Sequence, residues 1–247
     1  MIRVENISKR HEGRMVLKDV SMDIAEGANI GLIGPGGGGK SLILKIICGL
    51  VTPDSGNVFI DDIDVHSLGP TELADLRFRI GMLFQNYALF DFMNCADNIA
   101  FPLRQEGTHS EEEIAEAVHQ ALHDISLPDI GHLYPNELSG GMKKRVSFAR
   151  AVIRRPPIVF YDDPTAGLDP VTSSKIFILL RKIQTELGVT SVTISHDIGG
   201  IKEICDRFVL LDQGKIIFEG DRDEIEASEI PIVKKFWHGF SDDELNV

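Results

Sequence analysis

The chain has 247 residues, of which 43% are apolar and 26% charged, and its formal net charge is −13. This acidic balance argues against a nucleic-acid partner, because a surface that binds a polyanion needs clustered positive charge. No stretch approaches the roughly 18–20 uncharged apolar residues of a membrane span, and the N-terminus lacks a secretory signal pattern, so we expect any membrane role to come through a partner protein.

The N-terminal third is predicted to contain short strands and turns around one helix. Residues 16–24 alternate in a strand-like way, and residues 29–33 form a short apolar run that ends in glycines. A helix is expected over residues 41–48, ended by Gly49 and a turn with Pro and Gly. Further short strands are expected at residues 58–60 and 80–84.

The middle of the chain, residues 88–135, loses the strand pattern and shows helical periodicity instead. Ser110 followed by Glu113 fits a capping box at a helix N-terminus. Apolar side chains then recur at the three- and four-residue spacing of one helix face, at Ile114, Val118, Leu122 and Ile125. We therefore expect a helical subdomain inserted into an α/β core.

Strands and helices alternate in the C-terminal part, which predicts a mostly parallel sheet. The expected elements are a helix at 139–154, a strand at 158–161, a helix at 171–187, a strand at 190–194, a helix ending at Ile204, a hairpin turning at Gln213-Gly214 and a short last helix. The basic cluster Lys143-Lys144-Arg145 lies within the first of these helices and is interpreted as a solvated helix face.

A glycine-rich run joins the strand at 29–33 to the helix that follows it. Its sequence is Gly34-Pro35-Gly36-Gly37-Gly38-Gly39-Lys40-Ser41, which fits the phosphate-binding pattern G-x-x-x-x-G-K-[ST]. Glycines let successive backbone N–H groups converge on phosphate oxygens, and the helix N-terminus adds its dipole. The Lys40 ammonium is expected to reach the β- and γ-phosphates, and the Ser41 hydroxyl to hold Mg²⁺.

The same run also contains the dinucleotide-binding pattern G-x-G-x-x-G, and Asp61-Asp62 lies about where a ribose-binding acid should be. A run of glycines matches many glycine patterns, so this second match adds little. The Lys40-Ser41 pair favours a nucleoside triphosphate, because a dinucleotide requires neither the lysine nor a hydroxyl for Mg²⁺.

Further motifs follow the glycine loop in a fixed order. They are Leu138-Ser139-Gly140-Gly141-Met142, an apolar strand that ends in Asp162, the following Asp163-Pro164, the segment Ala166-Gly167-Leu168-Asp169, and His196 after another β run. With Gln85, and at this spacing, they make the chain resemble an ABC ATPase from end to end. The resemblance implies an α/β fold: a P-loop NTPase core with a mostly parallel sheet, an N-terminal antiparallel β subdomain and the inserted helical subdomain.

The resemblance implies ATP and Mg²⁺ at one site. Asp162 would orient the metal through water, alongside the Ser41 hydroxyl, and Gln85 would contact the metal and sense the transporter partner. Asp163 stands where the family places its general base. His196 would contact the γ-phosphate and the attacking water and so stabilise developing charge.

The resemblance also implies that the working unit is a dimer. In ABC ATPases the helix that begins at Ser139 caps the γ-phosphate bound to the opposite subunit, through the serine hydroxyl and the N–H groups of Gly140 and Gly141. Each ATP would then lie between two copies of the chain. The remaining residues expected to bind nucleotide are His11, Val16, Leu42 and Asp169.

The sequence departs from the family pattern in three places. Asp163 replaces the usual glutamate, which shortens its reach by about 1.3–1.5 Å; slow hydrolysis, a compensating backbone shift and dependence on His196 are the three alternatives, and we expect a working but slow ATPase. His11 stands where an aromatic residue often stacks on adenine, and it is interpreted either as a stacking group or as an exposed loop residue. Gly36 and Gly38 replace small polar residues and should leave the N–H cradle intact.

Finer resemblances point to the ATPases of lipid-transport systems of the mammalian-cell-entry (MCE) and maintenance-of-lipid-asymmetry (Mla) type. They lie at residues 83–91, at 98–104, at Met142, at Leu42 and in the tail 230–239. An amino-acid or phosphate importer is the alternative, and a soluble non-transport ABC ATPase is the second alternative. A protein that binds ATP without turning it over is a further alternative because of Asp163.

We expect one ABC ATPase domain over residues 1–247, with the core in 1–87 and 136–228, the helical insertion in 88–135 and a C-terminal extension in 229–247. The extension is interpreted either as a subunit contact or as a helix docked on its own domain. Expected partners are integral-membrane permease subunits, a second copy of the chain, an MCE-domain substrate-binding protein and a small regulatory subunit. Three widely spaced cysteines fit reduced thiols, and the expected location is the cytoplasmic face of the inner (plasma) membrane, as a peripheral protein.

Overall fold

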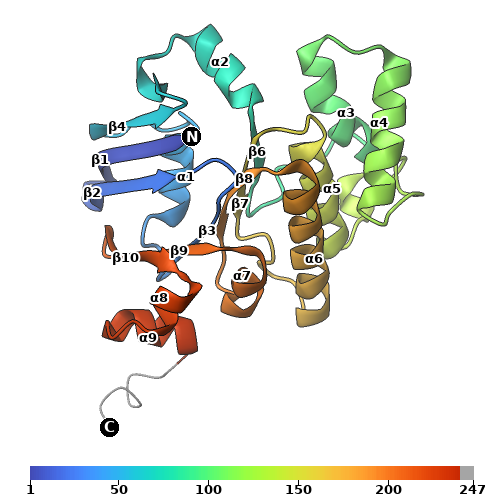
Figure 1. The fold of residues 1–247 in the computed structure, drawn as a ribbon. Helices are drawn as coiled ribbons and strands as arrows, with labels where there is room; N and C mark the ends of the chain where they lie inside the picture. The colour runs from blue at the N-terminus through green and yellow to red at the C-terminus, as the bar shows by residue number, and fades with distance from the viewer. Residues whose placement is uncertain (240–247) are drawn as a thin grey trace. The chain divides into compact units, whose positions relative to one another are not determined.

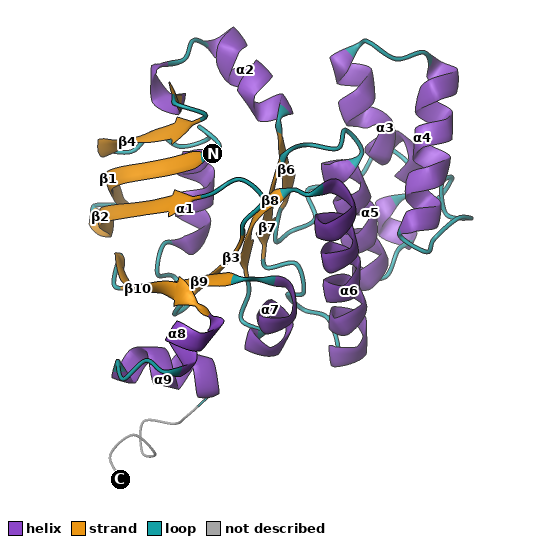
Figure 2. Ribbon diagram, viewed as in Figure 1, coloured by secondary structure: helices purple, strands orange, loops and turns teal. Residues whose placement is uncertain are grey.

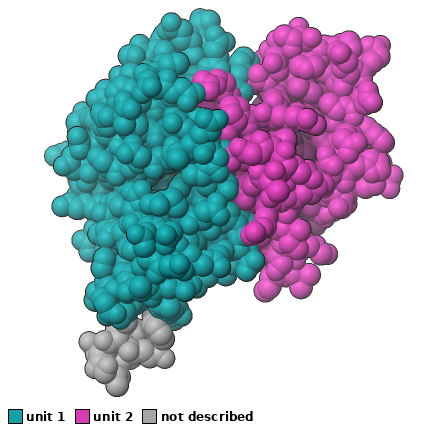
Figure 3. Space-filling model, in the orientation of Figure 1, with its two compact units in different colours: residues 1–78, 190–247 teal, residues 79–189 magenta. Residues whose placement is uncertain are grey.

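The computed structural model describes residues 1–239, so the last eight residues of the expected C-terminal extension, 240–247, lie outside the described part (Figures 1 and 2). The chain groups into two compact units, one formed by residues 1–78 together with the segment from residue 190 onward, and one formed by residues 79–189 (Figure 3). None of the helices in residues 1–239 combines the length and the apolarity that crossing a bilayer demands.

An antiparallel sheet forms the N-terminal part of the first unit. Its strands are β1 (Ile2–His11), β2 (Arg14–Ile24), β4 (Ser55–Ile60) and β5 (Ile63–Asp64), in the order β2-β1-β4-β5. All its pairings are antiparallel, with Ile2 opposite both Ile24 and Ile60. Side chains alternate along these strands, so one face is apolar and buried while the other carries charge. The predicted antiparallel β subdomain is confirmed.

The core sheet of the first unit is mostly parallel. Strand β3 (Asn29–Ile33) pairs in parallel with β8 (Thr190–Ile194) and with β9 (Arg207–Asp212), and β10 (Lys215–Asp221) returns antiparallel to β9. Every residue of β8 is buried, as expected for a strand covered on both faces. The helical elements of this unit are α1 (Lys40–Ile47), η1 (Val65–Ser67), α2 (Pro70–Phe78), α7 (Ile198–Ile204), α8 (Arg222–Glu226) and α9 (Pro231–His238).

The second unit combines two parallel strands with a group of helices (Figure 2). The strands are β6 (Ile80–Leu83) and β7 (Ile158–Asp162), and the helical elements are α3 (Cys95–Glu106), α4 (Glu111–Asp124), η2 (Pro135–Glu137), α5 (Gly140–Val152) and α6 (Pro170–Leu187). Helix α3 packs against both α4 and α5. All five residues of β7 are buried, as expected for a strand covered on both faces.

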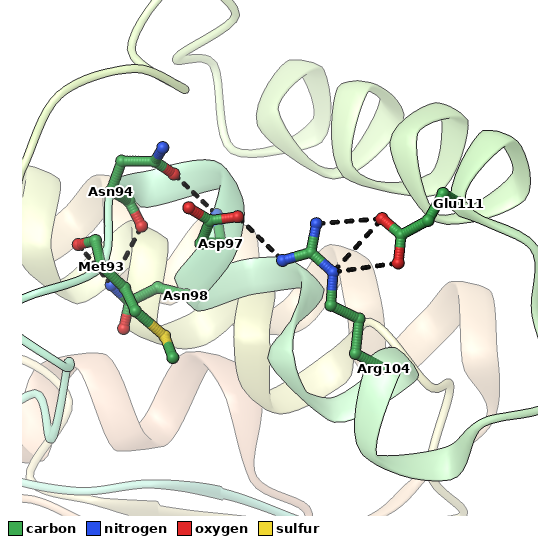
Figure 4. Close-up of polar contacts among 6 residues, drawn as sticks. All are labelled: Met93, Asn94, Asp97, Asn98, Arg104 and Glu111. Carbon is green, nitrogen blue, oxygen red and sulfur yellow. Dashed lines mark hydrogen bonds and ion pairs between the residues drawn. The ribbon is translucent and has the colours of Figure 1, made fainter.

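The expected helical segment is present as α3 and α4. The Ser110–Glu113 capping box is confirmed, and Ile114, Val118 and Leu122 are buried along one face of α4. Polar side chains join the two helices (Figure 4): the Arg104 guanidinium donates to Asp97 at 2.8 Å and to Glu111 at 3.1 Å. The Asn98 side chain is fully buried, and its amide donates to backbone carbonyls of the loop that precedes α3, including that of Met93. This loop therefore has a fixed conformation.

The predicted elements agree with the structure in most places, and the exceptions have physical reasons. Helix α2 was not predicted, because only Leu76 of its nine residues is buried and no helical apolar period is present. The C-terminal region forms two helices instead of one. The second, α9, docks on its own unit: Trp237 is 2% exposed, stacks edge-on against Phe208, and lies under the Lys202 ammonium at 4.1 Å.

Candidate nucleotide-binding and hydrolysis site

The glycine loop leaves β3 and enters α1, as the strand–loop–helix pattern predicts. Gly39 is the residue before the helix and has a φ of 99°, in the left-handed region that favours glycine. A Cβ atom there would lie 2.7 Å from Leu17 Cδ2 and 3.1 Å from Val16 Cγ1. The loop thus packs directly on strand β2, and Val16 belongs to its surroundings.

Lys40 is the first residue of α1, and its side chain folds back into the loop. Its ammonium donates to the carbonyl oxygens of Gly34 and Pro35 at 2.7 Å each, and the residue is 6% exposed. A positive charge therefore sits against the backbone at the start of the glycine loop, an arrangement suited to phosphate oxygens. Ser41 and Leu42 follow in the first turn, both half-buried.

His196 is brought to the same edge of the sheet as the glycine loop. Strands β3 and β8 are adjacent and parallel, with Leu32 opposite Ile194. The loop begins just after β3, and His196 comes two residues after β8, where it is exposed. Ligands of open parallel sheets bind outside the carboxyl ends of the strands, which is where both groups lie.

His11 is the residue whose placement adds least to the site. It ends β1 in the hairpin opposite Arg14, and its side chain is exposed. None of its contacts in residues 1–239 distinguishes a stacking role from that of an exposed loop residue, so the interpretation stays a prediction.

In the second unit, Gln85 and the acidic residues Asp162 and Asp163 lie at the same edge, because they come at the carboxyl ends of two adjacent parallel strands. Strands β6 and β7 pair with Leu83 opposite Tyr161, so Gln85 and the pair Asp162-Asp163 follow the same edge. Asp162 ends β7 and is 6% exposed, whereas Asp163 is half-buried and Gln85 is exposed. The φ of Asp163 is 49°, a left-handed conformation that a non-glycine residue rarely adopts.

The interpretation of the basic cluster at residues 143–145 as a solvated helix face is wrong for Lys144. The residue is fully buried, and its ammonium donates to the carbonyl oxygens of Gln85 at 2.7 Å and Asp163 at 3.1 Å. Burial lowers the pKa of this ammonium to about 8, although Asp163 and Asp162 oppose the shift. Arg145 is also half-buried and donates to the carbonyl of Ile125 at 3.1 Å.

A signal for this buried lysine was present in the sequence. Gly141, Lys144 and Phe148 are spaced as one face of a helix, and all three are buried in α5. A lysine on an apolar stripe has to find acceptors, since an unpaired buried charge is costly. The acceptors lie on loops 59 and 19 residues away along the chain, and no local pattern indicates them.

The segment Leu138-Ser139-Gly140-Gly141-Met142, which we call the signature segment, leads into α5. Ser139 is the N-cap residue, and its hydroxyl accepts from the Met142 N–H at 3.3 Å. Gly140 and Gly141 occupy the first turn, whose N–H groups have no partner four residues back within the helix. Asp169 is the N-cap of α6, where its carboxylate accepts from the Thr172 hydroxyl at 2.6 Å, and this bond lowers its pKa.

The residues present fit Mg²⁺ by their chemistry. Ser41 supplies a hydroxyl, Asp162 a carboxylate and Gln85 an amide oxygen, and oxygen donors are what this small cation prefers. Within residues 1–239 no cluster of three or more His, Cys, Asp or Glu side chains forms a metal site of protein ligands alone.

A lysine-bearing glycine loop between a parallel strand and a helix defines a phosphate-loop nucleoside triphosphatase, and a buried carboxylate at the end of another parallel strand fits the same class. The chain belongs to the ABC transporter family, whose model matches residues 17–166. It is 34% identical to the ATP-binding cassette MJ0796, whose dimeric structure contains ADP and Pi; the match covers 90% of this chain and 98% of that one, with a TM-score of 0.83.

Curated relatives extend the likeness along almost the whole chain. The methionine import ATP-binding protein MetN of Carboxydothermus hydrogenoformans is 40% identical over 96% of this chain and 71% of its own length. MetN of Clostridium acetobutylicum is 39% identical over 99% of this chain and 76% of its own length. MetN 2 of Bacillus cereus is 40% identical over 89% of this chain, which spans 66% of that relative.

These comparisons show the general function of the chain and change the kind of transporter that its sequence predicts. The chain is an ATP-hydrolysing subunit of an ABC transporter. The prediction of an Mla/MCE lipid transporter is not supported, because the relatives named above are methionine import proteins. The amino-acid importer alternative is favoured instead.

Proposed function

We propose that this protein hydrolyses ATP to drive an amino-acid importer, with methionine as the first cargo to test. The observation that carries the proposal is the 39–40% identity, over 96–99% of the chain, to two proteins named as methionine import ATP-binding proteins. Transport would require integral-membrane permease subunits, since no helix of residues 1–239 spans a bilayer. The chain would attach peripherally, on the cytoplasmic side where ATP is available.

The proposed working unit contains two copies of the chain. The dimeric form of the similar cassette MJ0796 supports this. In each copy the glycine loop would hold the phosphates of one ATP, and the helix tip at Ser139 would face the γ-phosphate held by the other copy. An MCE-domain protein and a small regulatory subunit are not part of this proposal.

Phosphoryl transfer needs positioning and electrostatic stabilisation more than covalent chemistry. We propose that Lys40, held among loop carbonyls, neutralises charge on the β- and γ-phosphate oxygens. Asp163 would accept the proton of the attacking water, and His196 would stabilise charge at the γ-phosphate. Ser41, Asp162 and Gln85 would hold Mg²⁺, which would supply positive charge to offset the negative charge of the phosphates.

The experiment that tests the cargo is isolation of the native complex followed by reconstitution in liposomes. Expected results are co-purification of permease subunits and ATP-dependent uptake of methionine, with phosphate release that depends on the complete transporter. Lys40→Ala is the control and should abolish both uptake and phosphate release, because the loop loses its positive charge. An MCE-domain partner, or turnover that responds to phospholipid and not to amino acids, would contradict the importer and restore the lipid alternative.

A further inference from the structure

Helix α5 holds the loop after β6 by three side chains spaced one turn apart. Lys144, Ser147 and Arg150 lie on one face of the helix, and each donates to a carbonyl of residues 85–88. The bonds are Lys144 Nζ to Gln85 O at 2.7 Å, Ser147 Oγ to Tyr87 O at 2.6 Å, and Arg150 Nη1 to Ala88 O at 2.7 Å. We call these three side chains the α5 donor row.

The loop held by the α5 donor row has an unusual backbone. Tyr87 has a φ of 59° and Ala88 a φ of 52°, left-handed conformations that side chains other than glycine disfavour. Such conformations persist only where the surroundings hold them in place. Hydrogen bonds to both carbonyls, from Ser147 and Arg150, supply that constraint.

Lys144 differs from the other two donors because it also holds a strained residue on a second loop. Its ammonium also donates to the carbonyl of Asp163 at 3.1 Å, and Asp163 has a φ of 49°. One fully buried ammonium therefore fixes the main chain on which Gln85 and Asp163 are both carried. A buried lysine is costly to retain for packing alone, and an apolar side chain of similar length would fill the same space.

We propose that Lys144 is a positioning residue for ATP hydrolysis: it fixes the Asp163 carboxylate relative to Gln85 by tying both main-chain carbonyls to helix α5. The inference rests on the catalytic roles proposed above for those two residues. Because Ser139 is the N-cap of α5, the same contact joins the helix tip that would face the second nucleotide to the water-activating residue of its own chain.

The test is steady-state phosphate release by the complete transporter containing Lys144→Met. Removing both hydrogen bonds lets the Asp163 backbone relax, and a displacement of about 1 Å can cost on the order of a hundredfold in rate. We expect kcat to fall at least tenfold, while KM for ATP and binding of a fluorescent ATP analogue stay within threefold. Lys143→Met is the matched control, with the same charge change on the neighbouring residue, and should retain kcat within twofold.

A double-mutant cycle with Asp163→Asn separates a failure of the proposed role of Lys144 from a failure of the function proposed above. If Lys144 acts through Asp163, Lys144→Met should lose most of its effect when Asp163 is already Asn. Full turnover by Asp163→Asn alone would show that Asp163 is not the base, which overturns the positioning role of Lys144 and leaves the importer proposal standing. An unchanged kcat in Lys144→Met, or an equal loss in both backgrounds, overturns the positioning role.

A second variant covers the case in which Lys144→Met fails to fold, which thermal unfolding of the purified chain would show. Lys144→Gln keeps one donor group for the two carbonyls and should give an intermediate kcat, between those of the wild type and Asp163→Asn. A kcat equal to that of the wild type in this variant overturns the proposal equally.

Discussion

Asp163 is the residue on which the rate of this ATPase is expected to depend. It follows the buried carboxylate of Asp162, its side chain is half-buried, and its left-handed backbone sets the direction in which the short carboxylate leaves the chain. An aspartate reaches about 1.3–1.5 Å less far than a glutamate. The backbone conformation therefore matters more for this side chain than for a longer one.

Substitution of Asp163 tests its role as the base. Asp163→Asn keeps the shape but cannot accept a proton, so we expect phosphate release by the complete transporter to fall by about 10²–10⁴-fold. Asp163→Glu keeps the carboxylate and should retain or raise turnover. ATP binding, measured by equilibrium dialysis, is the control and should change little in either variant. Undiminished phosphate release in Asp163→Asn would exclude this residue from the mechanism.

At the scale of elements, helices α5 and α6 approach each other closely at Gly141, where a side chain would not fit. A Cβ atom on Gly141 would lie 2.6 Å from Cγ2 of Thr172, in the first turn of α6. Thr172 cannot easily turn away, because it is β-branched and its hydroxyl donates to Asp169 at 2.6 Å. Close approach of the two helices thus depends on the absence of a side chain at Gly141.

Gly141→Ala should therefore destabilise the fold, although alanine favours helices over glycine by about 0.5–1 kcal/mol. The clash is expected to dominate, with a net loss of about 1–3 kcal/mol in the free energy of unfolding, measured by urea denaturation. Thr172→Ser removes the Cγ2 methyl and keeps the hydroxyl that bonds Asp169. Combined with Gly141→Ala it should recover most of the loss, and a purely additive double variant would contradict this contact.

At the scale of the whole molecule, the features that could be predicted from the sequence are those encoded by residues close together along the chain. Strand β3, the glycine loop and α1 are contiguous, so a short window predicts both their structure and their chemistry. The acceptors of the buried Lys144 could not be predicted in the same way, since Gln85 and Asp163 lie on distant loops. The cargo cannot be predicted from the site residues, because the same ATPase chemistry serves importers and lipid transporters, and in the proposed complex the permease subunits would select the cargo.

The proposed dimer makes a prediction that no single chain can satisfy. Chains with Lys40→Ala lack the phosphate-binding charge, and chains with Ser139→Ala lack the helix-tip hydroxyl, so each variant alone should be inactive or nearly so. In a mixed dimer both defects fall in one nucleotide site, and the other site is intact. With random pairing half of the dimers are mixed and one site in two works, so phosphate release should return to about a quarter of the wild-type rate.

The control for this mixing experiment is each variant chain measured alone at the same total concentration. The Ser139 variant also loses the cap of α5, which costs about 0.5–2 kcal/mol of stability, so its folding is checked by circular dichroism before mixing. If each ATP were held and cleaved within one chain, the mixture would show only the average of two inactive proteins. That result would exclude shared sites, because sharing is the only arrangement in which two defective chains complement each other.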